Sequence, residues 1–129
     1  VENVLSGRGL EQVYAWRRQE NGNPGEARAA EIMDACSGGD DASAKEAVSV
    51  FVRYLGTVCG DLSLIHLPFG GVFLVGGVAR AMLPHLGTFG FADAFRDKGR
   101  FSGFMQNFTV HAIEDDFAAL TGLVAYLEN

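Results

Sequence analysis

The sequence is poor in cysteine, with only Cys36 and Cys59 among its 129 residues. The two are isolated: there is no Cys-x-x-Cys pair and no histidine at ligand spacing, so we expect no structural zinc or other metal site. Free thiols in a domain of this size are typical of a reducing compartment, which predicts a cytoplasmic protein. His66, His85 and His111 lie at unrelated spacings, and we nominate none of them as a catalytic base.

Positive charge is also scarce. The chain has 10 Lys and Arg against 16 Asp and Glu, a net charge of −6. A nucleic-acid-binding surface needs clustered Lys and Arg, so we expect no nucleic acid as a partner. No apolar run approaches the roughly 20 residues that a bilayer span requires, so we expect no membrane association. With 48% hydrophobic residues, the chain can build a core as one domain or part of one.

Two helices are expected in the first third of the chain. Ser6 can cap the first of them. Residues 23–26, Asn-Pro-Gly-Glu, have the residue types of a capping box and predict that a second helix begins there. Gly38 and Gly39 are expected to end this second helix.

A third, longer helix is expected after Asp40 or Asp41, either of which can cap it, and before Pro68. Gly56 and Gly60 lie one turn apart within it and would let another backbone approach closely. Its apolar residues follow one another in steps of three and four, which predicts a buried stripe: Ala44, Val48, Phe51, Leu55, Val58, Leu62 and Ile65.

A strand, a glycine pair and a helix follow in residues 70–80, Gly-Gly-Val-Phe-Leu-Val-Gly-Gly-Val-Ala-Arg. The strand 72–75 is apolar on both faces, which predicts burial on both sides of an α/β sheet. Gly76 and Gly77 permit close contacts that a Cβ atom would forbid, and the next helix presents unpaired N–H groups at the same place. A flat or anionic ligand could therefore lie against bare backbone here. The alternative is a glycine-rich turn that binds nothing.

The remaining sequence predicts a helix over 78–83, a short helix over 91–95 and a second strand over 108–113. Asp115 and Asp116 are expected to cap a final helix. The fold class is therefore α/β and helix-rich, with two strands of what would be a larger sheet.

Three segments in matching order carry a family resemblance. Residues 2–10 read Glu-Asn-Val-Leu-Ser-Gly-Arg-Gly-Leu, residues 69–78 form the strand and glycine turn, and residues 90–101 read Gly-Phe-Ala-Asp-Ala-Phe-Arg-Asp-Lys-Gly-Arg-Phe. They resemble, respectively, the Glu-x-x-Leu-Ser-Gly-x-Gly-Leu segment, the adenosine-binding turn and the Gly-Phe-x-x-Ala-Phe-x-Asp-Lys-Gly-Arg-Phe block of bacterial-type glucokinases. The last block is the most specific, and the resemblance extends from Glu2 to about Ile113.

The resemblance implies a partial actin-like ATPase (ribonuclease H-like) lobe, with residues 1–129 as the carboxy-terminal part of the large, nucleotide-side domain. It implies phosphorylation of D-glucose at its 6-hydroxyl by ATP with Mg²⁺, the first step of glycolysis, in a homodimer. It also implies that Glu2 binds sugar hydroxyls and that Gly76, Gly77 and Val78 contact the adenosine of ATP. A solvated, unpaired carboxylate is the alternative reading of Glu2.

The chain also departs from the family. It starts at Val1 without a Met, and the family's phosphate-binding hairpin and general-base aspartate cannot be found in it. We therefore expect a fragment that is inactive alone and nominate no catalytic residue. Residues 117–122 stand where the family has Pro-Gly-Leu-Leu-Gly. Two alternatives stay open: a non-catalytic module that senses sugar or nucleotide or only dimerises, and a kinase for another hexose. The charged residues Asp97, Lys98 and Arg100 are interpreted as a surface ion-pair clip.

Overall fold

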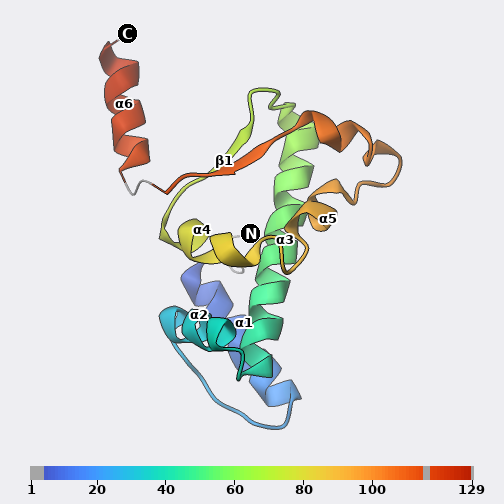
Figure 1. Cartoon of the computed structure of the whole chain (residues 1–129), viewed down its shortest axis with the longest axis vertical. Helices are drawn as coiled ribbons and strands as arrows, with labels where there is room; N and C mark the ends of the chain where they lie inside the picture. The colour runs from blue at the N-terminus through green and yellow to red at the C-terminus, as the bar shows by residue number, and fades with distance from the viewer. Residues whose placement is uncertain (1–4, 115–116, 129) are drawn as a thin grey trace.

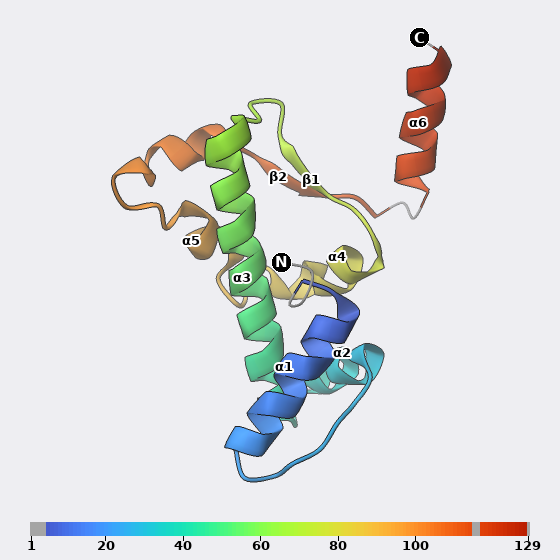
Figure 2. The ribbon, with the colours of Figure 1, turned by 180° about the vertical axis from the view of Figure 1, so that it is seen from behind.

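The structure is a computed structural model that describes residues 5–114 and 117–128. Its elements, in chain order, are α1 (Gly7–Glu20), α2 (Ala29–Gly38), α3 (Ala42–His66), β1 (Val72–Leu74), α4 (Gly77–Met82), the 3₁₀ helix η1 (Leu83–His85), α5 (Phe91–Arg96), the 3₁₀ helices η2 (Gly99–Phe101) and η3 (Phe104–Asn107), β2 (Val110–Ala112) and α6 (Ala118–Glu128). The long helix α3 forms the axis of the molecule (Figure 1). Helices α1 and α2 pack on its first half and α5 packs on its second half, as the reverse view also shows (Figure 2).

The first helix begins as predicted, but the second does not. The side chain of Ser6 accepts a hydrogen bond from the N–H of Gly9 at 3.0 Å and caps α1. Residues 23–28 lie outside any helix, and α2 begins at Ala29 instead. The N–H of Ala29 donates to Glu11 Oε1 of α1 at 2.9 Å. The start of α2 is therefore satisfied by a side chain from another helix, which a local capping pattern cannot reveal.

The ends of α2 and α3 follow the sequence signals closely. Gly39 ends α2 in the left-handed conformation, at φ 80°. Asp41, rather than Asp40, caps α3: its Oδ1 accepts from the N–H of Ser43 at 3.0 Å and from that of Ala44 at 3.2 Å. The helix ends at His66, just before Pro68 as predicted.

The buried face of α3 changes along its length. In the first half the predicted stripe is buried, but Leu62 is 48% exposed and Ile65 is 69% exposed. The second half buries a different face, made of small residues: Gly56, Cys59, Gly60 and Ser63. The reason is α5, whose backbone lies on this face. A Cβ atom on Gly56 would stand 2.6 Å from the carbonyl oxygen of Phe91, so the predicted close approach at these glycines is confirmed.

By length and composition α3 could also cross a membrane, so the expectation that no segment is long and apolar enough is wrong. In this structure the helix packs against α1, α2 and α5, and 10 of its residues are buried. Buried core helices of soluble proteins also reach this length and hydropathy, so the length and composition of α3 alone do not indicate a membrane span.

The core extends from α1, α2 and α3 to the sheet, whose partly buried Leu74 and Val110 pack against it. Its members come from α1–α5, η3 and the residue after η3: Leu10, Tyr14, Ile32, Cys36, Ala44, Ala47, Val48, Phe51, Val52, Cys59, Met82, Phe91, Phe95, Met105 and Phe108.

The two strands form a parallel pair, with Val72 opposite Val110 and Leu74 opposite Ala112. The expected burial on both faces is wrong for these residues. Leu74 packs against the core, whereas Phe73 points to the other face and is 55% exposed. Its ring stacks on that of His111 at 5.3 Å. Among the described residues, the core packs against the face of Leu74 and Val110, and the face of Phe73 is open.

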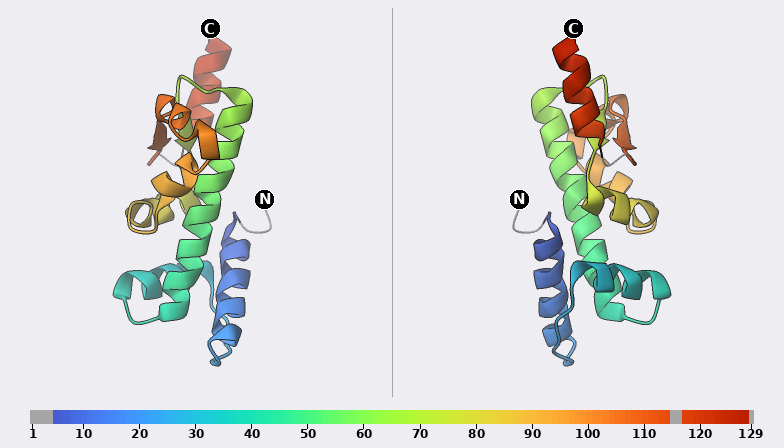
Figure 3. Two further views of the ribbon diagram at one scale, coloured as in Figure 1. Left: turned by 90° about the vertical axis from the view of Figure 1, so that its right-hand side faces the viewer. Right: turned by 90° about the vertical axis from the view of Figure 1, so that its left-hand side faces the viewer.

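The last helix, α6, stands away from the rest of the molecule (Figures 1 and 3). A final helix was predicted here, and its described apolar side chains are exposed, among them Leu123, Tyr126 and Leu127. The predicted caps Asp115 and Asp116 lie outside the described residues.

Candidate functional site

A groove of about 380 Å³ lies between α2 and α4, with the start of α1 at its base. Figure 1 shows α4 above α2, the two helices running in the same direction. The walls carry small side chains, Ala30 on α2 and Ala81 on α4. Leu10 and Met82 also line it, and each is only 1% exposed, so they form its floor. Its size falls in the range of small-molecule sites, roughly 300–1,000 Å³.

The glycine turn stands at one end of this groove. Gly76 joins β1 to α4 with φ 116° and ψ 169°, a conformation that favours glycine. A Cβ atom added to Gly76 or Gly77 would meet no atom of the described residues within 4 Å, so among these residues the backbone of both glycines faces open space. Gly77 and Val78 line the groove, and Val78 is 38% exposed. The structure thus brings two of the three predicted adenosine contacts to one cavity, with Gly76 beside it.

The other predicted site residue, Glu2, lies outside the described residues. Two later residues of the same motif lie at or near the groove. Ser6 caps α1, and Gly7 lines the groove together with Ala29. A Cβ atom on Gly7 would stand 3.7 Å from the Cβ atom of Ala29. The sugar-contact role of Glu2 stays a prediction.

Asp34 is the residue of this groove that sequence reasoning missed. Of the described residues that line the groove, Asp34 is the one with a charged side chain, and it is exposed. Among the described residues it has no ion pair or side-chain hydrogen bond. The available signal was its position in α2 directly after Met33, at the edge of that helix's apolar face.

Beyond the residues that line the groove, His85 of η1 contacts the end of α2. Its Nδ1 lies 4.0 Å from Cys36 Sγ and its Nε2 lies 3.5 Å from Ser37 Oγ. Burial raises the pKa of the Cys36 thiol, so this group is protonated at neutral pH. These contacts agree with a structural role for His85, and they tie α4 and η1 to α2.

The charged turn after α5 forms the expected ion pair, but with a partner on α3. Lys98 Nζ lies 2.7 Å from Asp61 Oδ1 and donates to the carbonyl oxygen of Thr57 at 3.1 Å. The Lys98 side chain is 8% exposed and Asp61 is 60% exposed. This contact fastens α5 to α3 and places no charge near the groove.

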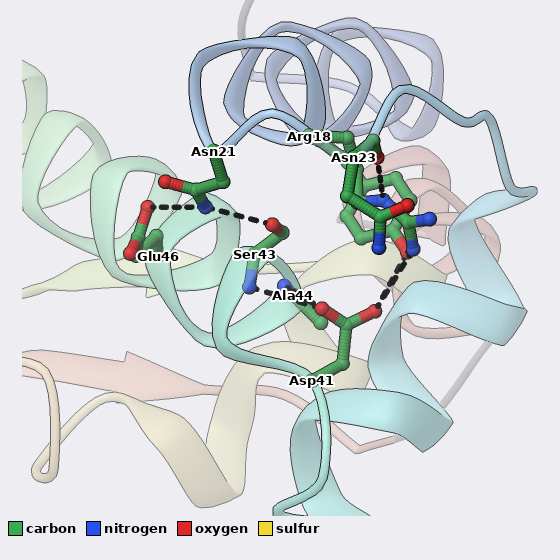
Figure 4. Close-up of polar contacts among 8 residues, drawn as sticks. Arg18, Asn21, Asn23, Asp41, Ser43, Ala44 and Glu46 are labelled. Atoms are coloured by element: carbon green, nitrogen blue, oxygen red, sulfur yellow. Dashed lines mark hydrogen bonds and ion pairs between the residues drawn. The ribbon is translucent and has the colours of Figure 1, made fainter.

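A polar cluster joins α1 to the start of α3 (Figure 4). The Tyr14 hydroxyl donates to Asp41 Oδ2 at 2.6 Å, and Arg18 Nη1 donates to the Tyr14 oxygen at 2.9 Å. Asn21 Nδ2 donates to Ser43 Oγ at 2.9 Å. The hydrogen bond from Tyr14 is the largest cause that lowers the pKa of the Asp41 carboxyl below its usual 3.8. Each group has a protein partner, so the cluster holds helices together.

Within the residues that the structure describes, no group of three or more His, Cys, Asp and Glu could hold a metal ion.

Comparisons with known proteins cover the whole chain. The family model described as Glucokinase matches residues 1–129. A glucokinase of Mesorhizobium japonicum is 41% identical over 129 residues, which is 99% of this chain and 38% of the relative. A glucokinase of Rhizobium meliloti is 40% identical over 126 residues, which is 97% of this chain and 37% of the relative. The chain therefore spans about 38% of the length of the curated relatives it matches.

A solved structure is similar as well. The crystal structure of glucokinase from an Antarctic psychrotroph matches with a TM-score of 0.88 and 29% identity, over 99% of this chain and 40% of that chain. The expected fold class, part of an α/β kinase lobe rich in helices, is confirmed by this similarity.

Proposed function

The chain belongs to the glucokinase family, and from this premise we propose that the full-length protein phosphorylates D-glucose with ATP to give glucose 6-phosphate. The observation that carries the proposal is the family match over residues 1–129, with a solved glucokinase structure at a TM-score of 0.88. Residues 1–129 form, in this proposal, the carboxy-terminal part of the large, nucleotide-side domain.

The role proposed for this part of the protein is to hold the adenosine of ATP. Gly76, Gly77 and Val78 supply the contact surface at the start of α4. Support comes from the open space around both glycines, where an added Cβ atom would meet nothing within 4 Å in the part of the chain that the structure describes. A bare backbone lets a nucleotide approach more closely than a side chain would permit. The adjoining groove of about 380 Å³ has room for a base.

Glu2 is proposed to hold the sugar. A carboxylate can accept hydrogen bonds from two adjacent hydroxyls, and charge-assisted bonds are stronger than neutral ones. Glu2 would thereby orient glucose so that its 6-hydroxyl meets the terminal phosphate, and positioning of this kind supplies much of the catalysis in phosphoryl transfer.

Mg²⁺, when bound, neutralises charge on the phosphates of ATP. The described residues include no cluster that fits this ion, so we assign it no ligand here. The general base is likewise placed outside these residues. The chemical contribution of this chain is therefore binding and orientation of the two substrates.

We further propose a cytoplasmic homodimer that binds neither nucleic acid nor membrane. The free, buried thiols of Cys36 and Cys59 support a reducing compartment. The net charge of −6 supports the absence of a nucleic-acid partner. The homodimer rests on family resemblance.

A coupled assay for glucose 6-phosphate, run on the full-length protein with ATP and Mg²⁺, tests the proposal. Mannose and fructose in parallel reactions test the hexose specificity. Phosphorylation of glucose with the highest kcat/KM is the expected result. A folded protein that phosphorylates no hexose would be the non-catalytic module instead.

A further inference from the structure

We infer that Asp34 selects the base of the nucleotide, accepting a hydrogen bond from the 6-amino group of adenine. The inference rests on the proposed function, because that function places adenosine at the groove between α2 and α4. It adds a specificity-determining residue on α2, outside the glycine turn.

The shape and lining of the groove suit a flat, apolar ring. Small side chains on both walls, Ala30 and Ala81, leave space between the two helices, and Val78 offers an exposed apolar surface at the entrance. The buried side chains of Leu10 and Met82 close the floor. A purine ring between these groups would bury apolar surface on both of its faces.

The charge of Asp34 is the exception in this lining. Within the described part of the chain its carboxylate has no ion pair and no hydrogen-bond donor. An ionised carboxylate can only accept hydrogen bonds. Adenine presents a 6-amino donor, whereas guanine and hypoxanthine present a 6-oxo acceptor, whose lone pairs a carboxylate repels. A carboxylate that faces the 6-position, and not the N1–H of a 6-oxo purine, would thus favour adenine by attraction and disfavour 6-oxo purines by repulsion, and this is the placement we infer for Asp34.

The register of α2 against α4 places Asp34 near the base rather than near the ribose. The starts of the two helices share one end of the groove, where Gly77 lies, and the His85–Ser37 contact of 3.5 Å joins their far ends. Asp34 and Ala81 stand about one turn beyond that first end. The proposed function puts the adenosine against Gly76, Gly77 and Val78 and its base in the adjoining groove, so the base extends along the groove toward Asp34.

The test compares ATP with inosine triphosphate in the full-length protein, wild type and Asp34→Asn. An asparagine amide can donate to a 6-oxo group, so the kcat/KM ratio of ATP to inosine triphosphate should fall about tenfold or more, as expected for one charge-assisted hydrogen bond. Calorimetric Kd values for ADP and inosine diphosphate should show the same change in ratio. Purine riboside triphosphate, which lacks the 6-amino group, should lose affinity relative to ATP in wild type and much less in the variant.

Glu31→Gln is the matched control. It removes one carboxylate charge from the same helix, but Glu31 lines the opposite hollow, between α1 and α2. Its ATP to inosine triphosphate ratio should equal that of wild type. An unchanged ATP to inosine triphosphate ratio in Asp34→Asn overturns the inference. So does a change in the ratio of ATP to 2′-deoxy-ATP in this variant instead, because that result would place Asp34 at the ribose. A wild-type protein that phosphorylates no hexose overturns the kinase proposal, while the diphosphate Kd values still decide the role of Asp34.

Discussion

The carbonyl oxygen of Phe95 lies only 2.5 Å from the position that a Cβ atom on Gly60 would take. Lys98 Cε lies at the same distance from that position. Backbone therefore meets backbone where α5 crosses α3, and the Lys98–Asp61 ion pair closes the contact from outside. Residues 91–98 belong to the family's most specific sequence block. They can pack this closely on α3 because Gly60 has no side chain.

Gly60→Ala should accordingly destabilise the full-length protein. Overpacking of this kind costs about 1–3 kcal/mol, and the opposing gain from replacing glycine in a helix is at most about 1 kcal/mol. Urea unfolding followed by circular dichroism would measure the difference. The control is Gly38→Ala in α2, where an added Cβ atom meets no other atom within 4 Å among the residues that the structure describes. It should be neutral or slightly stabilising, and equal effects of both substitutions would contradict the packing argument.

The Tyr14–Asp41 hydrogen bond should make stability depend on pH. The hydrogen bond that the Tyr14 hydroxyl donates is the main reason that the pKa of Asp41 is below the usual 3.8 in the folded state. A carboxyl with a lowered folded-state pKa contributes stability above its unfolded pKa and loses this contribution as the pH falls through the folded value. Tyr14→Phe should therefore cost about 1 kcal/mol at neutral pH, and this difference should shrink below about pH 4.

Unfolding free energies of wild type and Tyr14→Phe, measured at several pH values from neutral to acid, would check this. Tyr54→Phe is the matched control, since Tyr54 is 37% exposed on α3. Its effect should be small and independent of pH. A cost of Tyr14→Phe that stays constant into acid would show that Asp41 is not stabilised by this hydrogen bond.

Local signals in the sequence predicted most helix boundaries. Ser6 as a cap, Gly39 as a left-handed stop and Asp41 as a cap each depend on a few adjacent residues, so the sequence contains the whole cause. The start of α2 did not follow its local pattern, because the N–H of Ala29 is satisfied by Glu11 from another helix. The exposed Leu62 likewise depends on where α5 packs.

The candidate site was predictable to the same degree. Gly77 and Val78 belong to a contiguous strand–glycine–helix pattern, and the structure places both at the groove. Asp34 and His85 come from segments that meet α4 and α2 only after the chain has folded, so no spacing in the sequence joins them to the glycine turn. The open face of the sheet, with Phe73 exposed, was not predicted because strand composition does not show which neighbours a strand will have.

Gly77→Val should weaken ATP binding selectively in the full-length enzyme. The branched side chain would occupy the open space that the adenosine is proposed to use, so KM for ATP should rise roughly tenfold or more while KM for glucose changes little. Steady-state kinetics with each substrate varied in turn would measure this. Gly76→Val should have a similar or larger effect, because its φ of 116° also penalises a side chain.

Gly87→Val provides the control for the glycine turn, since a Cβ atom there also meets no described residue within 4 Å and Gly87 does not line the groove. Its kinetic constants should match those of wild type. Equal increases in both Michaelis constants for Gly77→Val would indicate general misfolding instead of a nucleotide contact.

Glu2→Gln tests the sugar site directly. The substitution keeps the size of the side chain and one acceptor but removes the charge. One charge-assisted hydrogen bond contributes on the order of 1.5–3 kcal/mol, so KM for glucose should rise roughly tenfold to more than a hundredfold, with KM for ATP nearly unchanged. Glu20→Gln, at the exposed end of α1, is the control for loss of one negative charge. If Glu2 is only a solvated carboxylate, Glu2→Gln and Glu20→Gln will both show wild-type sugar kinetics, and the assignment of the sugar contact to Glu2 is wrong.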